Sequence, residues 1–422
     1  MKQFFKFMLA SMAGFILTTF LFLFFIFIII ASIASFASKE EVMVKPGTVL
    51  TLDLSEAIPE RSPVSPFSFN QSSFLSKTTT PGLLETMDLL KKATEDENIR
   101  GIYLNLSDIP SGMATLEEIR NAILDFKQSG KFVIAYSETY SQKAYYMASA
   151  ADIICLNPEG FIDFKGLTGQ VLFLKGLLDK LDINAQVIRH GKYKSAIEPL
   201  ISDRMSEANK EQTLTYVGSI WQHISSEISK ARNIAPEKLQ NIADSLLLQT
   251  AEDAVKYGFA DKITYKDQVL DLLREKLELG STDKIEFLKL ESYKNSPALS
   301  SKKRSKDKIA IIYAVGEIGG GEGSDEAIGS ERISRAIRKA RLDDNVKAIV
   351  FRINSPGGSA LASDVILREI KLAREKKPVV ASMGDLAASG GYYIACAADT
   401  ILANPTTLTG SIGVFGVIPD FQ

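Results

Sequence analysis

The sequence has few of the residues that metal sites, disulfide frameworks and histidine-dependent catalysis require. Its 422 residues include two cysteines and two histidines. Neither an HExxH nor a CxxC motif occurs, so a zinc site is not expected. Cys155 and Cys396 lie in apolar segments where a buried thiol is the simpler interpretation, which argues against a disulfide framework. No histidine follows His223, so any base in the later part of the chain is of another type.

The chain also lacks a strong excess of either charge. The formal net charge is -2 and the sequence pI is about 6.0. A nucleic-acid partner is therefore not expected, because such proteins carry basic patches and a basic pI. With 45% hydrophobic and 24% charged residues, the chain is long enough for two domains with full cores.

The N-terminal stretch, in contrast, is long and apolar. Residues 7–38 contain no charged side chain, whereas Lys2 and Lys6 precede them. A helix needs roughly 20 apolar residues to cross a bilayer, so residues 7–38 are predicted to form a transmembrane anchor. A cleaved signal peptide is the alternative, although its apolar core is usually only about 7–15 residues. The basic residues predict a cytoplasmic N-terminus at 1–6, with the bulk of the protein on the outer side.

The pattern after the anchor alternates between strands and helices. The segment 60–82 is rich in Ser, Thr and Pro and is predicted to be a long surface loop. The strands are expected at 49–54, 101–106 and 132–136, and the helices at 83–95 and 116–129. This βαβ alternation predicts an α/β fold with a mainly parallel sheet.

An internal repeat is the strongest structural signal in the sequence. Residues 144–158 (AYYMASAADIICLNP) and 391–405 (GYYIACAADTILANP) agree at nine of fifteen positions, with a constant offset of 247. The offset predicts two tandem copies of one domain. The first copy is assigned to 48–295, the second copy to 308–422, and the basic segment 296–307 to a linker.

Two glycine turns in the second copy resemble parts of an acyl-transfer site. Ser389 follows the apolar run 378–383 and precedes Gly390, so it is expected at the N-terminus of a helix, where amides favour an oxyanion. A helix-capping serine is the alternative. A second turn, NSPGGS at 354–359, follows the apolar run 348–353, and its glycine pair can turn N–H groups toward a neighbouring site.

The first copy does not keep these features. At the offset of 247, Ser389 corresponds to Gln142 and Gly390 to Lys143. The NSPGGS turn corresponds to SDIPSG at 107–112, which lacks the paired glycines. The first copy is therefore predicted to keep the scaffold without a nucleophile or an oxyanion turn.

These motifs together resemble one known family. NSPGGS, AASGGYY and LTGSIG are similar in sequence and order to the signal peptide peptidase A (protease IV) family, which belongs to the Clp/crotonase fold group. The resemblance covers residues from about 48 to the end of the chain. It implies two tandem Clp/crotonase-like domains and a serine peptidase with a Ser/Lys dyad and no cofactor. It also implies that Ser389 is the nucleophile.

A serine hydroxyl needs a base, and the resemblance identifies a lysine. The segment YKSAIEP at 193–199 is similar to the family segment that carries the general base, which assigns this role to Lys194 and not to Lys192. A lysine with a pKa near 10.4 must be desolvated before it accepts a proton. The resemblance further implies that Ser411 orients the lysine, for which a simple turn serine is the alternative. The backbone N–H groups of Gly358 and Gly390 would then bind the oxyanion.

The expected function is thus a membrane-anchored endopeptidase that degrades remnant signal peptides and similar apolar peptides. The expected location is the inner membrane, single-pass, with most of the protein on the periplasmic side, in contact with lipid and as a homo-oligomer. Two alternatives remain, a crotonase-type acyl-CoA enzyme and a non-catalytic membrane scaffold. The second copy ends early relative to the first, so the sequence is expected to be a fragment of a longer chain.

Overall fold

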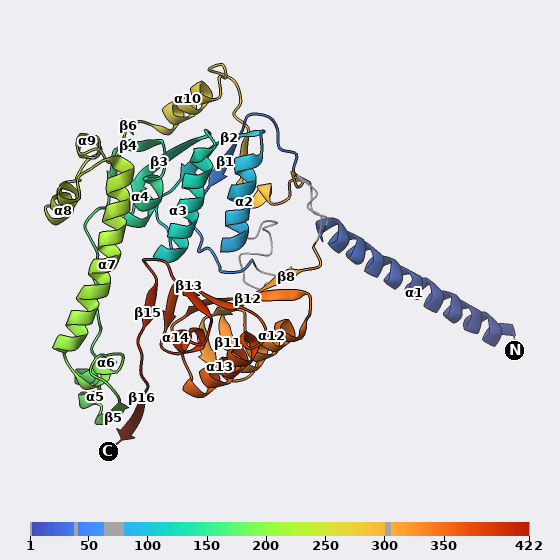
Figure 1. Ribbon diagram of the computed structural model, residues 1–422. Helices are drawn as coiled ribbons and strands as arrows, with labels where there is room; N and C mark the ends of the chain where they lie inside the picture. The colour runs from blue at the N-terminus through green and yellow to red at the C-terminus, as the bar shows by residue number, and fades with distance from the viewer. Residues whose placement is uncertain (1, 38–40, 63–79, 300–304, 422) are drawn as a thin grey trace.

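The computed structural model describes residues 2–37, 41–62, 80–299 and 305–421 (Figure 1). It is a mixed α/β structure with two separate parallel sheets and one long apolar helix at the N-terminus. We refer to residues 41–299 as the first part and to residues 305–421 as the second part. The predicted α/β class with parallel sheets is confirmed, whereas the assignment of two tandem Clp/crotonase-like domains stays a prediction.

The first part is built on a six-stranded sheet in which every strand pair is parallel. The strand order is β6-β4-β3-β2-β1-β7. The strands are β1 Thr48–Leu52, β2 Ile99–Asn105, β3 Phe132–Tyr140, β4 Ile153–Ile162, β6 Lys262–Ile263 and β7 Phe287–Lys289.

Helices cover both faces of this first sheet, as parallel sheets require. Leucine, isoleucine and aromatic side chains of one helical layer form the main core with one face. These helices are α2 Leu83–Glu95, α3 Met113–Gln128, α4 Gln142–Ala148, α7 Glu207–Arg232, α8 Pro236–Asp244, α9 Ala251–Lys256 and α11 Leu290–Tyr293. Helix α10 (Lys266–Lys276) packs against the other face, where Tyr103 and Ile134 meet Val269 and Leu273.

The second part has a smaller sheet of the same kind. Its order is β14-β13-β12-β8, with β15 paired to the far end of β13, and all pairs are parallel. The strands are β8 Lys308–Val315, β12 Val346–Ser355, β13 Val379–Ala388, β14 Thr400–Leu402 and β15 Leu408–Gly410. Its core is shared with α12 Ser330–Leu342, α13 Ala360–Arg374 and α14 Gly390–Ala395. A small sheet beside it contains β9 Glu317–Gly319, β10 Gly323–Ser324 and β11 Ala327–Gly329.

Several elements of the two parts correspond at the offset found in the sequence. Helices α2 and α12 begin and end 247 residues apart, and the starts of α3 and α13 and of β3 and β13 differ by the same number. Strands β1 and β8 do not, because the segment between the first strand and the first helix is longer in the first part. The repeated pattern therefore extends to the order and length of elements, and the domain boundaries themselves stay predictions.

A two-stranded antiparallel ribbon joins the two parts away from their main sheets (Figure 1). Strand β5 (Ile183–Arg189) lies in the first part, between the short helices α5 (Lys175–Lys180) and α6 (Glu198–Ile201). It pairs with β16 (Phe415–Phe421) near the C-terminus, in a register that sets Phe415 opposite Arg189. The ribbon therefore brings the loop after β5 next to the loop before β16.

Helix α1 (Lys2–Ala37) extends away from both sheets (Figure 1). It is long and apolar enough to cross a membrane, and the side chains of its apolar window are not buried against the rest of the protein. This helix fits the predicted anchor in length and composition. The last predicted anchor residue, Ser38, lies outside the described residues.

Two expectations about burial were wrong. Cys396 was expected to be buried like Cys155, but it is exposed, because it is the C-cap of α14 and follows the buried residues of that short helix. Glu60 was assigned to a surface loop, but it is buried, because it forms an ion pair with Arg352 of the second part. Residues 63–79 of that predicted loop and residues 300–304 of the predicted linker lie outside the described residues.

Candidate active site

Ser389 occupies a strained turn between a strand and a helix. Strand β13 ends at Ala388 and α14 begins at Gly390, so Ser389 is the residue between them. Its φ of 54° and ψ of -116° are unusual for a residue with a side chain. Its N–H donates to the carbonyl oxygen of Gly410 at 2.8 Å, which fixes the turn against β15. The side chain makes no capping hydrogen bond to α14, so the capping interpretation is wrong.

The predicted glycine turn lies directly against Ser389. Gly357 has φ of 101°, and a Cβ there would lie 2.5 Å from the N atom of Gly390 and 2.9 Å from Cβ of Ser389. Gly358 has φ of 147°, and a Cβ there would lie 2.2 Å from the carbonyl oxygen of Ile318. Only glycine fits at these two positions, because φ is positive and the neighbouring backbone leaves no space.

Two N–H groups remain available beside the serine hydroxyl. The parallel bridge with Ile318 uses the carbonyl oxygen of Gly357 and the N–H of Ser359, so it leaves the N–H of Gly358 unused. Gly390 is the first residue of α14, where N–H groups have no partner within the helix. Among the residues that the structure describes, neither Gly358 nor Gly390 donates its N–H to a protein acceptor. The two groups lie close together beside Ser389, since Gly390 follows it in sequence and a Cβ on Gly390 would lie 3.2 Å from the N atom of Gly358.

Lys194 reaches Ser389 from the other part of the chain. It lies in the loop after β5, and its Nζ is 3.0 Å from Oγ of Ser389. The residue is only 4% exposed. Burial lowers the pKa of Lys194, because desolvation disfavours its charged form. The ribbon of β5 and β16 explains how a lysine 195 positions away in sequence comes within hydrogen-bond distance.

Ser411 supplies the other two contacts of the lysine. Nζ of Lys194 donates to the carbonyl oxygen of Ser411 at 2.7 Å and lies 3.0 Å from its Oγ. Ser411 itself has a φ of 50° in the loop between β15 and β16. A neutral amine has two hydrogens and one lone pair. If both hydrogens go to Ser411, the lone pair faces the hydroxyl of Ser389, as a general base requires.

The other candidate bases have different surroundings. Lys192 is exposed, with its Nζ 4.9 Å from the centroid of the Tyr193 ring. His190 is exposed as well. His223 lies on α7, with its Nε2 3.0 Å from a carboxylate oxygen of Glu117 on α3. Neither histidine forms a hydrogen bond with Ser389, so the base predicted from the sequence, Lys194, is the one that the fold brings to the serine.

The corresponding turn of the first part is filled by its own side chains. Gln142, at the position of Ser389, accepts from the N–H groups of Lys165 and Gly166, both at 3.2 Å, and donates to the carbonyl oxygen of Gly166. Lys143 donates to the carbonyl oxygen of Ser111 at 2.8 Å. These contacts occupy the positions that correspond to Ser389 and to the glycine turn of the second part.

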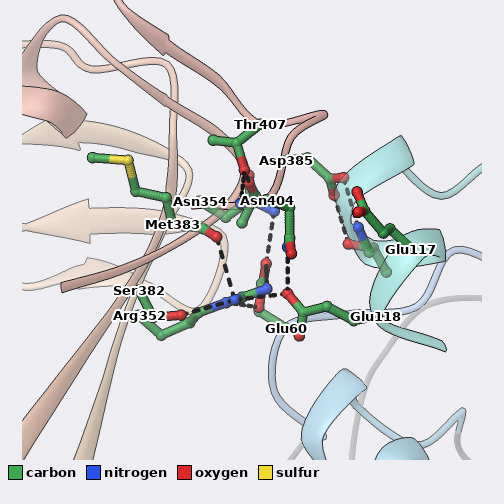
Figure 2. Close-up of polar contacts among 12 residues, drawn as sticks. Glu60, Glu117, Glu118, Arg352, Asn354, Ser382, Met383, Asp385, Asn404 and Thr407 are labelled. Atoms are coloured by element: carbon green, nitrogen blue, oxygen red, sulfur yellow. Dashed lines mark hydrogen bonds and ion pairs between the residues drawn. The ribbon is translucent and has the colours of Figure 1, made fainter. Parts of the chain in front are cut away.

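Sequence reasoning missed a polar cluster at the interface of the two parts (Figure 2). Its centre is Arg352 on β12, which forms ion pairs with Glu60 and Glu118 of the first part. The signal for it was present, since Arg352 is the only charged residue in the apolar run 348–353. A buried strand tolerates such a charge only with a partner, but the sequence does not identify that partner.

Comparisons with known proteins identify the family of this chain. The model of peptidase family S49 matches residues 125–280 and 371–422, which include both Lys194 and Ser389. Protease 4 of Salmonella typhi is 40% identical over 345 residues, which is 80% of this chain and 55% of that protein. The chain belongs to peptidase family S49.

Two further relatives support the same family assignment. Protease 4 of Haemophilus influenzae is 36% identical over 359 residues, 81% of this chain and 58% of that protein. The chloroplastic serine protease SPPA of Arabidopsis thaliana is 37% identical over 376 residues, 88% of this chain and 54% of that protein. The chain thus spans a little more than half the length of the curated relatives that it matches.

Proposed function

We propose that this protein is a membrane-anchored serine endopeptidase with Ser389 as nucleophile and Lys194 as general base. The observation that carries the proposal is the 3.0 Å contact between Nζ of Lys194 and Oγ of Ser389, in a site that desolvates the amine. The membership in a peptidase family favours this activity over the acyl-CoA chemistry that the fold group also contains.

In the proposed mechanism, neutral Lys194 takes the hydroxyl proton while Oγ of Ser389 attacks the carbonyl carbon of a peptide bond. The tetrahedral oxyanion accepts hydrogen bonds from the N–H groups of Gly358 and Gly390. The C–N bond then breaks, and the leaving amine takes the proton from Lys194, which leaves an ester on Ser389. Lys194 next deprotonates a water molecule that attacks the ester. The bond between the acyl carbon and Oγ then breaks, the carboxylic acid product leaves, and Lys194 returns the proton to Oγ of Ser389.

Ser411 has an orienting role in this proposal. Its carbonyl oxygen and Oγ accept the two hydrogens of the neutral amine, so the lone pair stays directed at Ser389. A lysine held in this way needs no carboxylate partner, which would raise its pKa and keep it protonated.

The substrates in this proposal are remnant signal peptides and other apolar, unfolded peptides. Helix α1 supports a site close to a membrane, where such fragments accumulate. The proposed location is the inner membrane with the two sheets on the periplasmic side, and the proposed assembly is a homo-oligomer. Two tandem Clp/crotonase-like domains, 48–295 and 308–422, would provide the lysine and the serine.

The test is labelling with a fluorophosphonate probe, followed by mass spectrometry and by hydrolysis of an apolar fluorogenic peptide. The wild-type protein should be labelled at Ser389. Ser389→Ala and Lys194→Ala should each lose labelling and hydrolysis, whereas Lys192→Ala, an exposed lysine two residues away, should keep both. An equal loss in Lys192→Ala, or hydrolysis that survives Ser389→Ala, would refute the assignment.

A further inference from the structure

A buried ion cluster lies where the two parts of the chain meet (Figure 2). Arg352 of β12 donates from Nε to Glu60 at 2.8 Å and from Nη1 to Glu118 at 3.0 Å. Both carboxylates belong to the first part, and Arg352 and Glu60 are 8% and 7% exposed. Replacing a buried ion pair by apolar residues is often neutral or stabilising, so the cluster is poorly explained by stability alone.

The side chain of Asn354 links this cluster to two strands of the second sheet. Its Nδ2 donates to Oε1 of Glu60 at 3.0 Å, and its Oδ1 accepts from the N–H of Leu386 at 3.1 Å. The carboxylate of Glu60 is close to the backbone there, since a Cβ on Gly384 would lie 2.4 Å from its Oε1. A carboxylate only accepts hydrogen bonds, so Glu60 determines which way the Asn354 amide is turned.

The backbone that Asn354 holds lies within a few residues of the proposed reacting groups. On β12 the next residue is Ser355, whose Oγ accepts from the N–H of Gly357 at 3.1 Å and donates to the carbonyl oxygen of Gly316 at 2.6 Å. On β13, Leu386 precedes Ser389 by three residues. One amide side chain therefore joins the strand end that carries the oxyanion turn to the strand end that carries the nucleophile.

We propose that Glu60 and Asn354 are positioning residues, through which the first part of the chain sets the geometry of the oxyanion turn and of Ser389. This inference rests on the function proposed above. Glu60 fixes the Asn354 amide, Asn354 holds the ends of β12 and β13 in register, and Arg352 balances the charge of Glu60. The part that supplies the lysine thus also aligns the nucleophile that the lysine activates.

The hydrogen-bond directions provide a sharp test in the full-length protein. Glu60→Gln keeps the size but sets an NH2 group opposite the NH2 group of Asn354. Asn354→Asp sets a second carboxylate opposite Glu60 while it keeps the acceptor for Leu386. In the double variant E60Q/N354D, the amide of the new glutamine donates to the new aspartate, so the hydrogen bond is restored with its direction reversed.

Each single variant should lower kcat for peptide hydrolysis by about 10- to 100-fold with KM nearly unchanged, the effect expected of a small displacement of reacting atoms. The double variant should recover kcat to within a few-fold of wild type, a coupling that independent sites do not show. The rate of fluorophosphonate labelling at Ser389 should follow kcat. Single variants with wild-type kcat, or a double variant no faster than the product of the single effects, would overturn the proposal.

Thr406→Val is the matched control at the same interface. It removes the hydrogen bond that the Thr406 hydroxyl donates to Glu117 at 2.9 Å, and it leaves the hydrogen bonds of Asn354 in place. It should lower the thermal midpoint and leave kcat unchanged. A loss of kcat in this control equal to that of Asn354→Asp would mean that any weakening of the interface is sufficient, which would refute a specific role for Asn354.

Asn354→Ala keeps the proposal testable if the other single variants fail to fold. It removes both hydrogen bonds without adding a charge, so it should fold and still lose kcat without a matching change in KM. A wild-type protein that is labelled no better than Ser389→Ala would refute the proposed function itself. Ser389-dependent labelling that is unaffected in Glu60→Gln and Asn354→Ala would refute only the positioning role.

Discussion

At the scale of single residues, the central feature is an amine surrounded by oxygen atoms but shielded from water. Lys194 contacts Ser389 and Ser411, and the cause of its lowered pKa is desolvation. The charged amine can donate a hydrogen bond in all three contacts. The neutral amine can donate in two of them and accept in the third. The low exposure of the side chain is what favours the neutral, basic form.

This lowered pKa predicts the pH dependence of the proposed peptidase. The base is active only when neutral, so kcat/KM should rise with pH, with a midpoint below the ordinary lysine value of 10.5. A pH–rate profile measures the midpoint, and labelling of Ser389 across the same pH range provides a check without peptide. A midpoint at or above 10.5 would contradict the lysine assignment.

The lowered pKa of Lys194 also makes the stability of the folded protein depend on pH, in a direction that can be predicted. In the unfolded chain Lys194 has its ordinary pKa, whereas the folded protein lowers it. Between the two values the unfolded chain binds a proton that the folded chain does not, so stability should rise with pH across that window.

At the scale of elements, the sequence pattern predicted local structure well. Helix α2 has the predicted bounds, 83–95. The strand predicted at 378–383 extends to Ala388, because its last residues pair with β15 beyond a register shift against β12. Gly384 and Asp385 are typical of a turn, and they lie within the strand because the segments on either side of them pair with β12 and β15.

The site residues were predicted from local turns and from the family resemblance. Neither source predicted the long-range contacts that bring the two parts of the chain together. The glycine turn and Ser389 lie where strands of one parallel sheet end, which a sequence pattern can indicate. The pairing of β5 with β16 joins segments far apart in sequence, and no local pattern predicts such a partner. The same is true of Glu60, whose role depends on a partner in the other part.

The tight turn at Gly357 predicts that one added methyl group at this residue lowers the activity severely. Gly357→Ala would place a Cβ 2.5 Å from the N atom of Gly390, at a backbone φ of 101°. Loss of the oxyanion donors should lower kcat by about 100-fold or more. Gly320→Ala is the matched control, since a Cβ there meets no atom within 4 Å. Equal activity of the two variants would rule out the proposed role of this turn.

The ribbon of β5 and β16 predicts that a variant which breaks its pairing displaces Lys194 from Ser389. In an antiparallel pair every second residue donates its N–H to the partner strand, so one of Val417→Pro and Ile418→Pro must break the ladder. That variant should lose labelling of Ser389, because Lys194 is no longer held beside it. Ile418→Thr keeps the N–H and a β-branched side chain, and it should retain labelling. Full labelling of both proline variants would contradict this role of the ribbon.

At the scale of the whole molecule, the two parts share a pattern but differ in their turns. Gln142 and Lys143 fill one turn with their own side chains, whereas Ser389 and Gly390 leave the other open. The internal repeat, and the presence of Gln142 and Lys143 where the second copy has Ser389 and Gly390, were evident from the sequence alone. The interface that combines a lysine of one part with a serine of the other required the structure.

The isolated position of α1 predicts that the anchor is separable from the proposed activity. A variant that lacks residues 2–40 should be soluble without detergent and keep labelling of Ser389, because the apolar window of α1 does not pack on either sheet. Fractionation of cells measures the first property. N-terminal sequencing of the full-length protein distinguishes an anchor from a cleaved signal peptide, since cleavage near residue 38 would remove α1.

The ribbon between β5 and β16 has a consequence for biosynthesis. Ser411, whose carbonyl oxygen accepts a hydrogen bond from Nζ of Lys194, lies 217 positions after that lysine in the chain, and β16 follows it. A ribosome must therefore synthesise both parts, through β16, before the catalytic amine meets its alcohol. On the proposed mechanism, the growing polypeptide is a latent protease that cannot cut its own emerging segments or its neighbours during translation.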